Sequence, residues 1–347
     1  MKFDARLSSE GSSALATGQI SRWAEEIGVD GLWAGENKHD AFLPLAVAAE
    51  NTSRIELGTA VAIAFSRSPM VTAQLAWDLQ RRSGGRFLLG LGTQVKPHVE
   101  RRFSMPWDRP VARLRDYIGA LRAIWHSFQS GEALRYDGEF YRHSLLPPVF
   151  NPGPIDTPVI PISIAGVSPG LIRLAGEVCD GLHVHPFHSP AYVRSVVVSE
   201  VEKGAASAGR AASNVELSTS VFVITGETER ERQRQRAAVR SRIAFYASTP
   251  AYRVVLDIHG WGAVGDELHT LSRSGRWEDM SDRVSEEMLH AFAVEADPND
   301  VGAALRERYD GLLDRVALFE FMLPGDRDDF WRELARTCGD HPQEATT

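Results

Sequence analysis

The chain has 347 residues, of which 43% are hydrophobic and 24% charged, and its formal net charge is −8. These values are ordinary for a globular protein with a large core. The acidic balance argues against nucleic acid or an anionic membrane as the main partner.

Cysteine content and the N-terminal residues favour a cytoplasmic protein. The chain holds two cysteines, Cys179 and Cys338, which fit a reducing compartment and exclude a disulfide framework. The first residues carry charges where a secretory signal needs an apolar run. No stretch of eighteen consecutive apolar residues occurs, so we expect no membrane span.

Apolar runs alternate with amphipathic segments along most of the chain. We expect eight strands, at residues 3–7, 31–34, 55–62, 87–90, 162–166, 181–185, 215–224 and 314–319. We expect helices after them, at 18–27, 42–51, 69–82, 111–128, 169–176, 190–208, 227–246 and 326–336, with extra helices at 250–271 and 280–290. Strands about thirty residues apart, with a helix between them, are typical of parallel βαβ units.

The count of elements predicts an α/β fold, a closed (β/α)8 TIM barrel. A doubly wound open sheet is the alternative, and the lack of a G-x-G-x-x-G fingerprint after the first strand weakens it. We expect one domain over residues 1–338 and a flexible tail at 339–347. The pattern breaks at about 130–160 and 247–295, which we interpret as insertions after strands four and seven.

We expect substrate specificity to come from these two insertions and the residues beside them. Their aromatic side chains either line an apolar pocket or pack the insertions onto the barrel. These side chains are Phe140, Phe245, Tyr246, Trp261 and Trp277.

In a parallel barrel, function lies at the C-terminal ends of the strands. The second expected strand is followed by Glu36, Asn37, Lys38, His39 and Asp40, the densest ionisable cluster in these loops. A histidine there could exchange a proton near neutral pH. The alternative is a polar loop whose Asp40 caps the next helix.

Three other strand ends carry candidate ligand-binding residues. Gly92-Thr93-Gln94 and Gly166-Val167-Ser168 offer N–H groups and hydroxyls that suit phosphate oxygens, although ordinary βα turns have the same composition. His183 and His185 share one strand face, as a metal pair would. Because no carboxylate cluster accompanies them, we expect no metal and favour a ligand-facing His185 or simple packing.

Several segments together carry a family resemblance. They are Glu26-Ile27-Gly28-Val29-Asp30-Gly31-Leu32-Trp33, Arg54-Ile55-Glu56-Leu57-Gly58-Thr59-Ala60-Val61, Ser68-Pro69, Ser83-Gly84-Gly85-Arg86-Phe87-Leu88-Leu89-Gly90-Leu91-Gly92-Thr93 and Ala175-Gly176-Glu177-Val178-Cys179-Asp180-Gly181. With them the chain resembles the luciferase-like monooxygenase superfamily, and within it the coenzyme F420-dependent oxidoreductases found mainly in actinobacteria.

The resemblance implies a barrel that holds a flavin or deazaflavin at its strand ends. It also implies a non-prolyl cis peptide, Ala60-Val61, behind the ring. At the catalytic Asp-His pair of relatives this chain has Glu36 and Asn37, and His39 could replace the missing histidine. Contacts to the cofactor would come from Ala60, Val61, Thr93, Gln94, Val95, Gly166, Val167, Ser168 and His185.

The reaction implied is hydride transfer between coenzyme F420 and a small organic substrate. One alternative is an FMN-dependent monooxygenase that uses dioxygen on the same barrel. Another is a flavin- or deazaflavin-binding barrel without catalysis. Relatives are often homodimers, so a second copy of the chain is the expected protein partner, with neither nucleic acid nor membrane bound.

Overall fold

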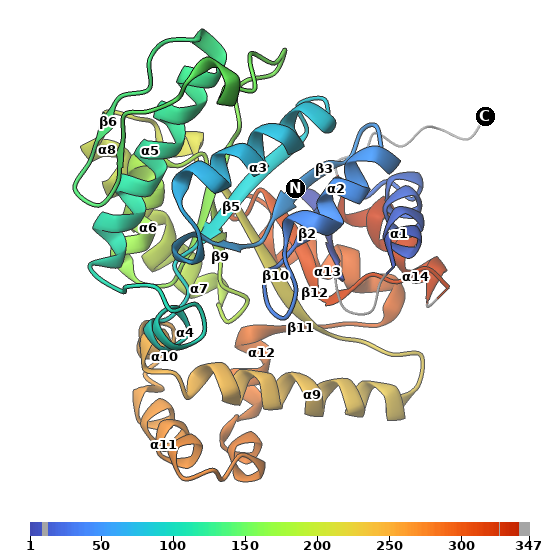
Figure 1. The fold of residues 1–347 in the computed structure, drawn as a ribbon. Helices are drawn as coiled ribbons and strands as arrows, with labels where there is room; N and C mark the ends of the chain where they lie inside the picture. The colour runs from blue at the N-terminus through green and yellow to red at the C-terminus, as the bar shows by residue number, and fades with distance from the viewer. Residues whose placement is uncertain (9–12, 326, 340–347) are drawn as a thin grey trace.

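The computed structural model describes residues 1–8, 13–325 and 327–339, and in these residues the strands form a closed parallel barrel (Figure 1). Each strand pairs with its neighbour, and the pairing of β12 with both β1 and β10 closes the ring. The eight staves are β1 (Lys2–Leu7), β2 (Gly31–Ala34), β3 (Glu56–Thr59) with its continuation β4 (Ala62–Ile63), β5 (Phe87–Gly92), β8 (Ile162–Gly166), β9 (Gly181–Val184), β10 (Glu216–Ile224) and β12 (Arg315–Phe321). The (β/α)8 prediction is confirmed.

Helices surround the barrel. They are α1 (Ala14–Glu26), α2 (Phe42–Asn51), α3 (Pro69–Arg82), α5 (Pro110–Ser130), α6 (Pro169–Val178), α7 (Pro190–Tyr192), which runs through a π-helix η3 (Val193–Val198) into α8 (Ser199–Ser207), α13 (Val301–Tyr309) and α14 (Asp328–Cys338). Ser68 and Ser168 cap α3 and α6, each followed by a proline in the first turn, where the missing N–H costs nothing. Short turns of 3-10 helix are η1 (Ala64–Ser66), η2 (Pro148–Phe150), η4 (Ala212–Asn214), η5 (Pro250–Tyr252), η6 (Glu278–Arg283) and η7 (Pro298–Asp300).

The insertion after β10 forms a separate layer beside the barrel mouth, drawn in yellow and orange in Figure 1. It comprises α9 (Glu229–Ala247), α10 (Arg253–Asp257), α11 (Gly262–Arg273), α12 (Glu286–Phe292) and the strand β11 (Ala293–Glu295), which pairs in parallel with β10. A capping box of Thr228 and Glu231 begins α9.

Two predictions for this insertion are wrong. The helix expected at 227–246 as the seventh outer helix is α9, which belongs to the added layer, and α13 supplies the outer helix before β12. The insertion was expected to be all helical, whereas β11 ends it. Nine-residue α13 and three-residue β11 are too short for a clear hydrophobic period.

The other insertion, residues 131–161, packs along α5. Its predicted hairpin is confirmed as β6 (Tyr136–Asp137) and β7 (Arg142–His143). The Tyr136 hydroxyl donates to Asp116 on α5 at 2.6 Å, and Tyr141 packs edge-on against Tyr117. This insertion therefore thickens the helical layer rather than covering the mouth.

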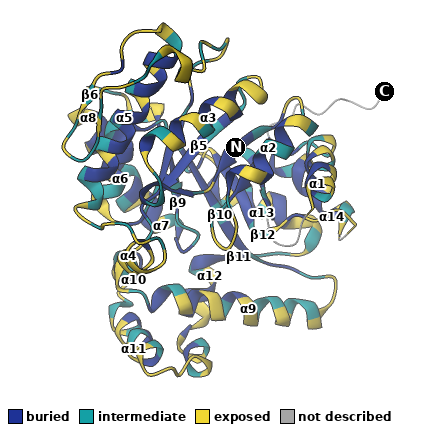
Figure 2. Ribbon diagram, viewed as in Figure 1, coloured by how far each residue is buried: buried dark blue, intermediate teal, exposed yellow. Residues whose placement is uncertain are grey.

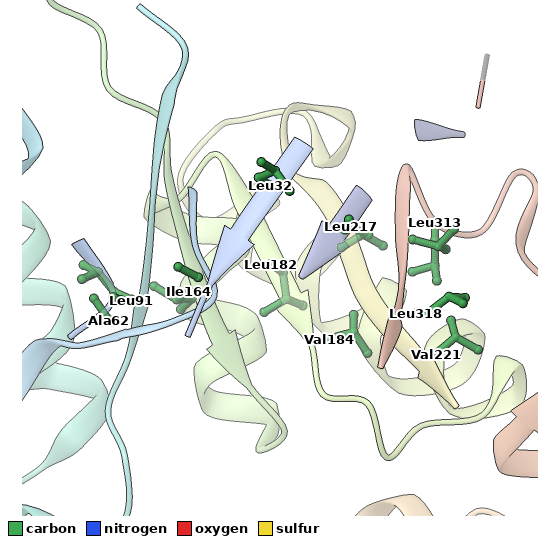
Figure 3. Close-up of a cluster of buried hydrophobic side chains, with 14 of the residues drawn as sticks. Leu32, Ala62, Leu91, Ile164, Leu182, Val184, Leu217, Val221, Leu313 and Leu318 are labelled. Carbon is green, nitrogen blue, oxygen red and sulfur yellow. The ribbon is translucent and has the colours of Figure 1, made fainter. Parts of the chain in front are cut away.

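The barrel strands are mostly buried, as their dark blue colour in Figure 2 shows. Their apolar side chains form the core cluster drawn in Figure 3, which includes Leu32, Leu91, Ile164, Leu182 and Leu318. The alternate positions of the same strands carry polar and aromatic side chains, because successive residues of a strand point to opposite faces. No described helix is both long and apolar enough to cross a membrane.

Candidate active site at the barrel mouth

A cavity of about 190 Å³ lies where the strands end. Its walls combine backbone, aromatic rings and hydroxyl groups from seven different staves of the barrel. The lining residues are Asp4, Arg6, Trp33, Ala60, Val61, Ala165, His183, Val184, His185, Pro186, Ser218, Thr219, Ser220, Ala317 and Phe319. A mostly apolar pocket with a few polar groups is the usual form of a small-molecule site.

The third strand of the barrel is interrupted at this cavity. The expected single strand 55–62 is divided into β3 and β4 by a cis peptide bond between Ala60 and Val61, as the family resemblance implied. Both residues line the cavity. Gly92 on the neighbouring strand leaves room for this segment, since a Cβ there would lie 2.6 Å from Cγ2 of Val61.

Glu36 anchors the segment that follows the cis bond. Its backbone N–H donates to the carbonyl of Val61 at 3.2 Å, and its carboxylate accepts from the N–H of Ile63 at 2.7 Å. Both carboxylate oxygens also receive hydrogen bonds from the Arg67 guanidinium, at 2.7 and 2.8 Å. With its side chain only 8% exposed, Glu36 serves as a brace between the loop after β2 and the Val61 segment.

Asn37 and His39 occupy different surroundings from Glu36. Both are exposed, and the carbonyl of Asn37 accepts a hydrogen bond from Arg102. His39 lines neither this cavity nor the neighbouring cleft described below. Asp40 accepts from the N–H groups of Phe42 and Leu43, so the capping role considered for it is confirmed.

His185 is held as a neutral ring in the cavity wall. Its Nδ1 accepts a hydrogen bond from the N–H of Phe187 at 3.1 Å, which leaves the proton on Nε2. The ring stacks on Tyr252 with a centroid distance of 4.5 Å and meets Tyr246 edge-on at 4.7 Å. Burial, and to a lesser degree the neighbouring His188, lower the pKa of His185 to about 3.

His183 lies two residues earlier on the same strand and lines the same cavity. Its Nδ1 is 2.7 Å from the Ser218 hydroxyl, and its ring meets the Trp33 indole edge-on. Its Nε2 is buried without a hydrogen-bond partner beside Gly90. Burial and the charge of Arg315 lower the pKa of His183 to about 4, so this imidazole is also neutral near pH 7.

The two expected phosphate-binding loops follow neighbouring strands, because β5 pairs with β8. In the first loop Gln94 has a positive φ of 60°, and its side chain accepts from the N–H of Val95. The buried Thr93 hydroxyl donates to the Gln94 carbonyl. These bonds hold a tight turn at the rim.

The second loop is anchored to the helix layer. The Val167 carbonyl accepts from the Tyr192 hydroxyl at 2.8 Å, and Ser168 caps α6. Gly166 has no room for a side chain, since a Cβ there would lie 2.6 Å from Cβ of Leu171. The loop therefore fits the ordinary βα-turn interpretation as well as the phosphate one.

A second cleft, of about 470 Å³, lies between α9 and the ends of β10 and β12. Arg6 and Phe319 line both spaces, so the two are adjacent. Its lining residues are Arg6, Asn37, Lys38, Phe222, Val223, Gln235, Ala238, Val239, Arg242, Leu318, Phe319, Glu320 and Phe321. We call this space the α9 cleft.

Several residues at the mouth were missed in the sequence. Arg6, Trp33, Ser218, Ser220 and Phe319 all line the cavity. The signal that could have found them is the alternation in the first and seventh strands, where polar residues recur at every second position. In the described residues, no group of three or more His, Cys, Asp or Glu side chains could hold a metal ion.

The expected specificity role of the first insertion finds no support here. Among the residues the structure describes, none from 131–161 lines the cavity or the α9 cleft. Phe140 instead lies under the Arg109 guanidinium. In the second insertion, Trp261 stacks on His259, while Phe245 and Trp277 are about half exposed and pack against each other.

Comparison of the sequence with those of known proteins finds similar relatives. An uncharacterized protein of Mycobacterium tuberculosis is 49% identical over 292 residues, 84% of this chain and 86% of the relative. A 5,10-methylenetetrahydromethanopterin reductase of Archaeoglobus fulgidus is 28% identical over 292 residues, 82% of this chain and 83% of the relative.

Solved structures share the fold. The coenzyme F420-dependent tetrahydromethanopterin reductase of Methanopyrus kandleri superposes with a TM-score of 0.77 at 20% identity, over 97% of both chains. The oxygenating constituent of 3,6-diketocamphane monooxygenase of Pseudomonas putida, in complex with FMN, gives 0.66 at 15% identity over 98% of both. The family model for luciferase-like monooxygenases matches residues 1–315. The chain therefore belongs to the luciferase-like monooxygenase family.

Proposed function

We propose that the protein is a coenzyme F420-dependent oxidoreductase that transfers a hydride between the deazaflavin and a small organic substrate. The observation that carries the proposal is the cavity at the barrel mouth, whose lining includes the Ala60-Val61 segment and the neutral imidazoles of His183 and His185. The sequence similarity to a methylenetetrahydromethanopterin reductase, over more than four fifths of the chain, supports the same reaction class.

The residues present fit a planar heteroaromatic ring with polar edges. Trp33, Phe319 and the Ala60-Val61 segment offer apolar contact, and the Ser220 hydroxyl offers hydrogen bonding. The buried His183 Nε2 without a partner marks an unsatisfied polar atom in the same wall. The loops at 93–95 and 166–168 would hold the more distant, anionic part of the cofactor.

The chain would bind, orient and shield the reacting groups. When bound, F420 supplies hydride chemistry at a carbon that reacts poorly with dioxygen. Glu36 fixes the Val61 segment through the N–H of Ile63, which gives the cavity a rigid wall. His185, neutral near pH 7 with its proton on Nε2, offers a hydrogen bond rather than a positive charge.

Tyr246 is a positioning residue behind His185, because it lines neither the cavity nor the α9 cleft. Its ring meets His185 edge-on, and burial raises the pKa of its hydroxyl, so the group is protonated near pH 7. Arg6 and Arg242 lie close enough to act on this hydroxyl electrostatically and partly oppose the rise.

An FMN-dependent monooxygenase is the second candidate. The fold similarity to a monooxygenase solved with FMN favours it, although at 15% identity that similarity concerns the fold alone. The two candidates differ in the cofactor that the apoprotein binds.

Parallel titration of the apoprotein with F420 and FMN, followed by cofactor fluorescence, tests the proposal. We expect saturable binding of F420 and at least tenfold weaker binding of FMN. Tight FMN binding without F420 binding would overturn the proposal. A Val61→Gly variant, which alters the cavity wall without touching charged groups, should weaken F420 binding if the ring occupies this cavity.

A further inference from the structure

Two arginines of the α9 cleft, Arg6 and Arg242, form no ion pair with a carboxylate among the described residues. Arg242 on α9 lines the cleft, and in the described part of the chain it forms no ion pair. Its neighbours on the same helix differ, since Arg236 binds Glu286 and Glu295, and Arg240 binds Glu286. Arg242 thus differs from Arg236 and Arg240, because it lines a cleft and does not pair with a glutamate.

Arg6 approaches the same place from the barrel. The guanidinium groups of Arg6 and Arg242 lie 4.6 and 4.4 Å from the centroid of the Phe319 ring, so both cations contact one aromatic side chain. Arg6 also donates to the Phe319 carbonyl, which fixes its position. No described carboxylate pairs with Arg6.

The acidic group in the cleft does not cancel this charge. Glu320 lines the cleft, but its carboxylate accepts from Arg327 at 2.8 Å. The other lining side chains include the polar Asn37, Lys38 and Gln235 and the apolar Phe222, Val239 and Leu318. The cleft therefore combines an apolar, aromatic surface with unneutralised positive charge.

We infer that the α9 cleft binds the substrate, and that this substrate is a planar organic carboxylate whose anionic group lies between Arg6 and Arg242. The inference rests on the proposed function, because it assigns the cleft next to the cofactor cavity to the second reactant. Arginine suits a carboxylate through paired N–H donors, and the phenylalanine rings suit its flat apolar part. The volume of about 470 Å³ lies in the range of small-molecule sites.

Pairs of charged and neutral probes test the inference with the full chain. Calorimetry would compare 2-naphthoate with 2-naphthamide, which have nearly the same shape, with and without F420. We expect naphthoate to bind about tenfold or more tightly than naphthamide, and the difference to shrink as salt is raised. Equal binding of the two probes would overturn the inference.

Variants of α9 locate the charge that is responsible. Arg242→Gln should abolish the preference for naphthoate, and Arg242→Lys should retain part of it. Arg234→Gln is the matched control, because Arg234 is an exposed arginine of the same helix that does not line the cleft. A preference that survives in Arg242→Gln would overturn the inference.

The anionic tail of F420 is the other source of a ligand with the same chemistry. If Arg242→Gln lowers the affinity for F420 about tenfold and leaves naphthoate binding unchanged, the cations hold the cofactor and the substrate inference is overturned. The naphthoate measurement on the apoprotein separates the two proposals. Failure to bind F420 with an intact naphthoate preference would contradict the proposed function alone.

Discussion

The two ends of the barrel interior differ in whether their arginines pair with carboxylates. At the floor, Arg315 is fully buried and donates to both oxygens of Asp4 at 2.7 Å, with Glu56 and Glu216 beside it. At the mouth, Arg6 and Arg242 contact an aromatic ring and have no described carboxylate partner. Trp33 joins the two levels, since its indole N–H donates to Asp4 and its side chain lines the cavity.

The difference separates charges that hold the barrel from charges that can meet a ligand. A buried ion pair contributes little net stability, but removing one partner leaves an uncompensated charge and is costly. The floor is thus sensitive to any change in charge. At the mouth, a ligand can supply the missing counter-charge, so substitutions there should alter binding more than folding.

The largest effect is expected at the floor. Arg315→Met leaves the Asp4 carboxylate buried without its partner and should lower the free energy of unfolding by about 3–5 kcal/mol, measured by urea denaturation. The double variant Arg315→Met/Asp4→Leu should recover part of this loss, because neither charge then stays unpaired.

A surface pair provides the control. Arg115 also forms a two-bonded pair with a carboxylate, that of Glu177, but its side chain is 45% exposed. Arg115→Met should cost at most about 1 kcal/mol. A loss at Arg315 no larger than the loss at Arg115 would contradict the distinction between floor and surface.

A second change tests the layer that joins floor and mouth. Gly58 on β3 faces the Trp33 indole so closely that a Cβ would overlap the ring. Gly58→Ala should therefore destabilise the protein by about 1–3 kcal/mol. It should also weaken ligand binding, because the displaced indole lines the cavity.

Gly170→Ala is the matched control for this change. A Cβ at Gly170 would meet Val111 at 3.5 Å, an ordinary contact, so its unfolding midpoint should stay close to that of the unmodified protein. If Gly58→Ala unfolds at the same urea concentration as this control, the close packing of Trp33 is not a constraint on the fold.

Much of the architecture could be predicted from the sequence because apolar runs and their spacing report it directly. All eight strands lie where the pattern placed them, and Ala60-Val61 is cis as the family resemblance implied. The pairing of Glu36 with Arg67 could not be predicted, because the partners are thirty-one residues apart and the conformations of the loops after β2 and β4 decide whether they meet.

The contacts at the mouth of the barrel are harder to predict than its strands. Arg6 and Phe319 lie at opposite ends of the sequence, and their contact depends on β1 pairing with β12. Arg242 is an exposed residue on a helix rich in arginine, and its sequence neighbours do not show that it lines a cleft. Periodicity does not show which layer a helix joins.

An intermediate effect is expected from pH for each of three buried histidines near the mouth, because these rings are neutral near pH 7. Burial lowers the pKa of His183 and His188 to about 4 and of His185 to about 3, whereas an unfolded histidine titrates near 6.5. Below pH 6.5 the unfolded chain binds protons at these histidines and the folded chain does not. The free energy of unfolding therefore decreases as the pH is lowered. Each histidine contributes a slope of up to about 1.4 kcal/mol per pH unit, lost again near its folded pKa.

Urea denaturation at pH 7.5, 6.5, 5.5 and 5.0 measures this slope. His188→Gln should reduce it, because His188 is fully buried and its Nε2 lies 3.0 Å from the Tyr309 hydroxyl. His126→Gln is the matched control, because it makes the same substitution at an exposed histidine on α5. A stability that is flat between pH 7.5 and 5.0 would mean that the three rings are accessible to protons.

The smallest effects are expected in the loop after β2, where the roles of Glu36 and His39 can be separated. Glu36→Gln keeps the shape of the brace but removes the charge that binds Arg67, so we expect about 1 kcal/mol of lost stability and weaker F420 binding. If Glu36 only positions the Val61 segment, the pH profile of kcat keeps its shape in this variant.

His39→Gln should change stability by less than about 0.5 kcal/mol and leave turnover intact, because His39 is exposed and lines neither space at the mouth. If Glu36→Gln loses one limb of the pH profile, Glu36 takes part in proton transfer. If His39→Gln loses turnover, His39 does so. Either result would place the proton transfer at the rim of the cavity and not in its wall.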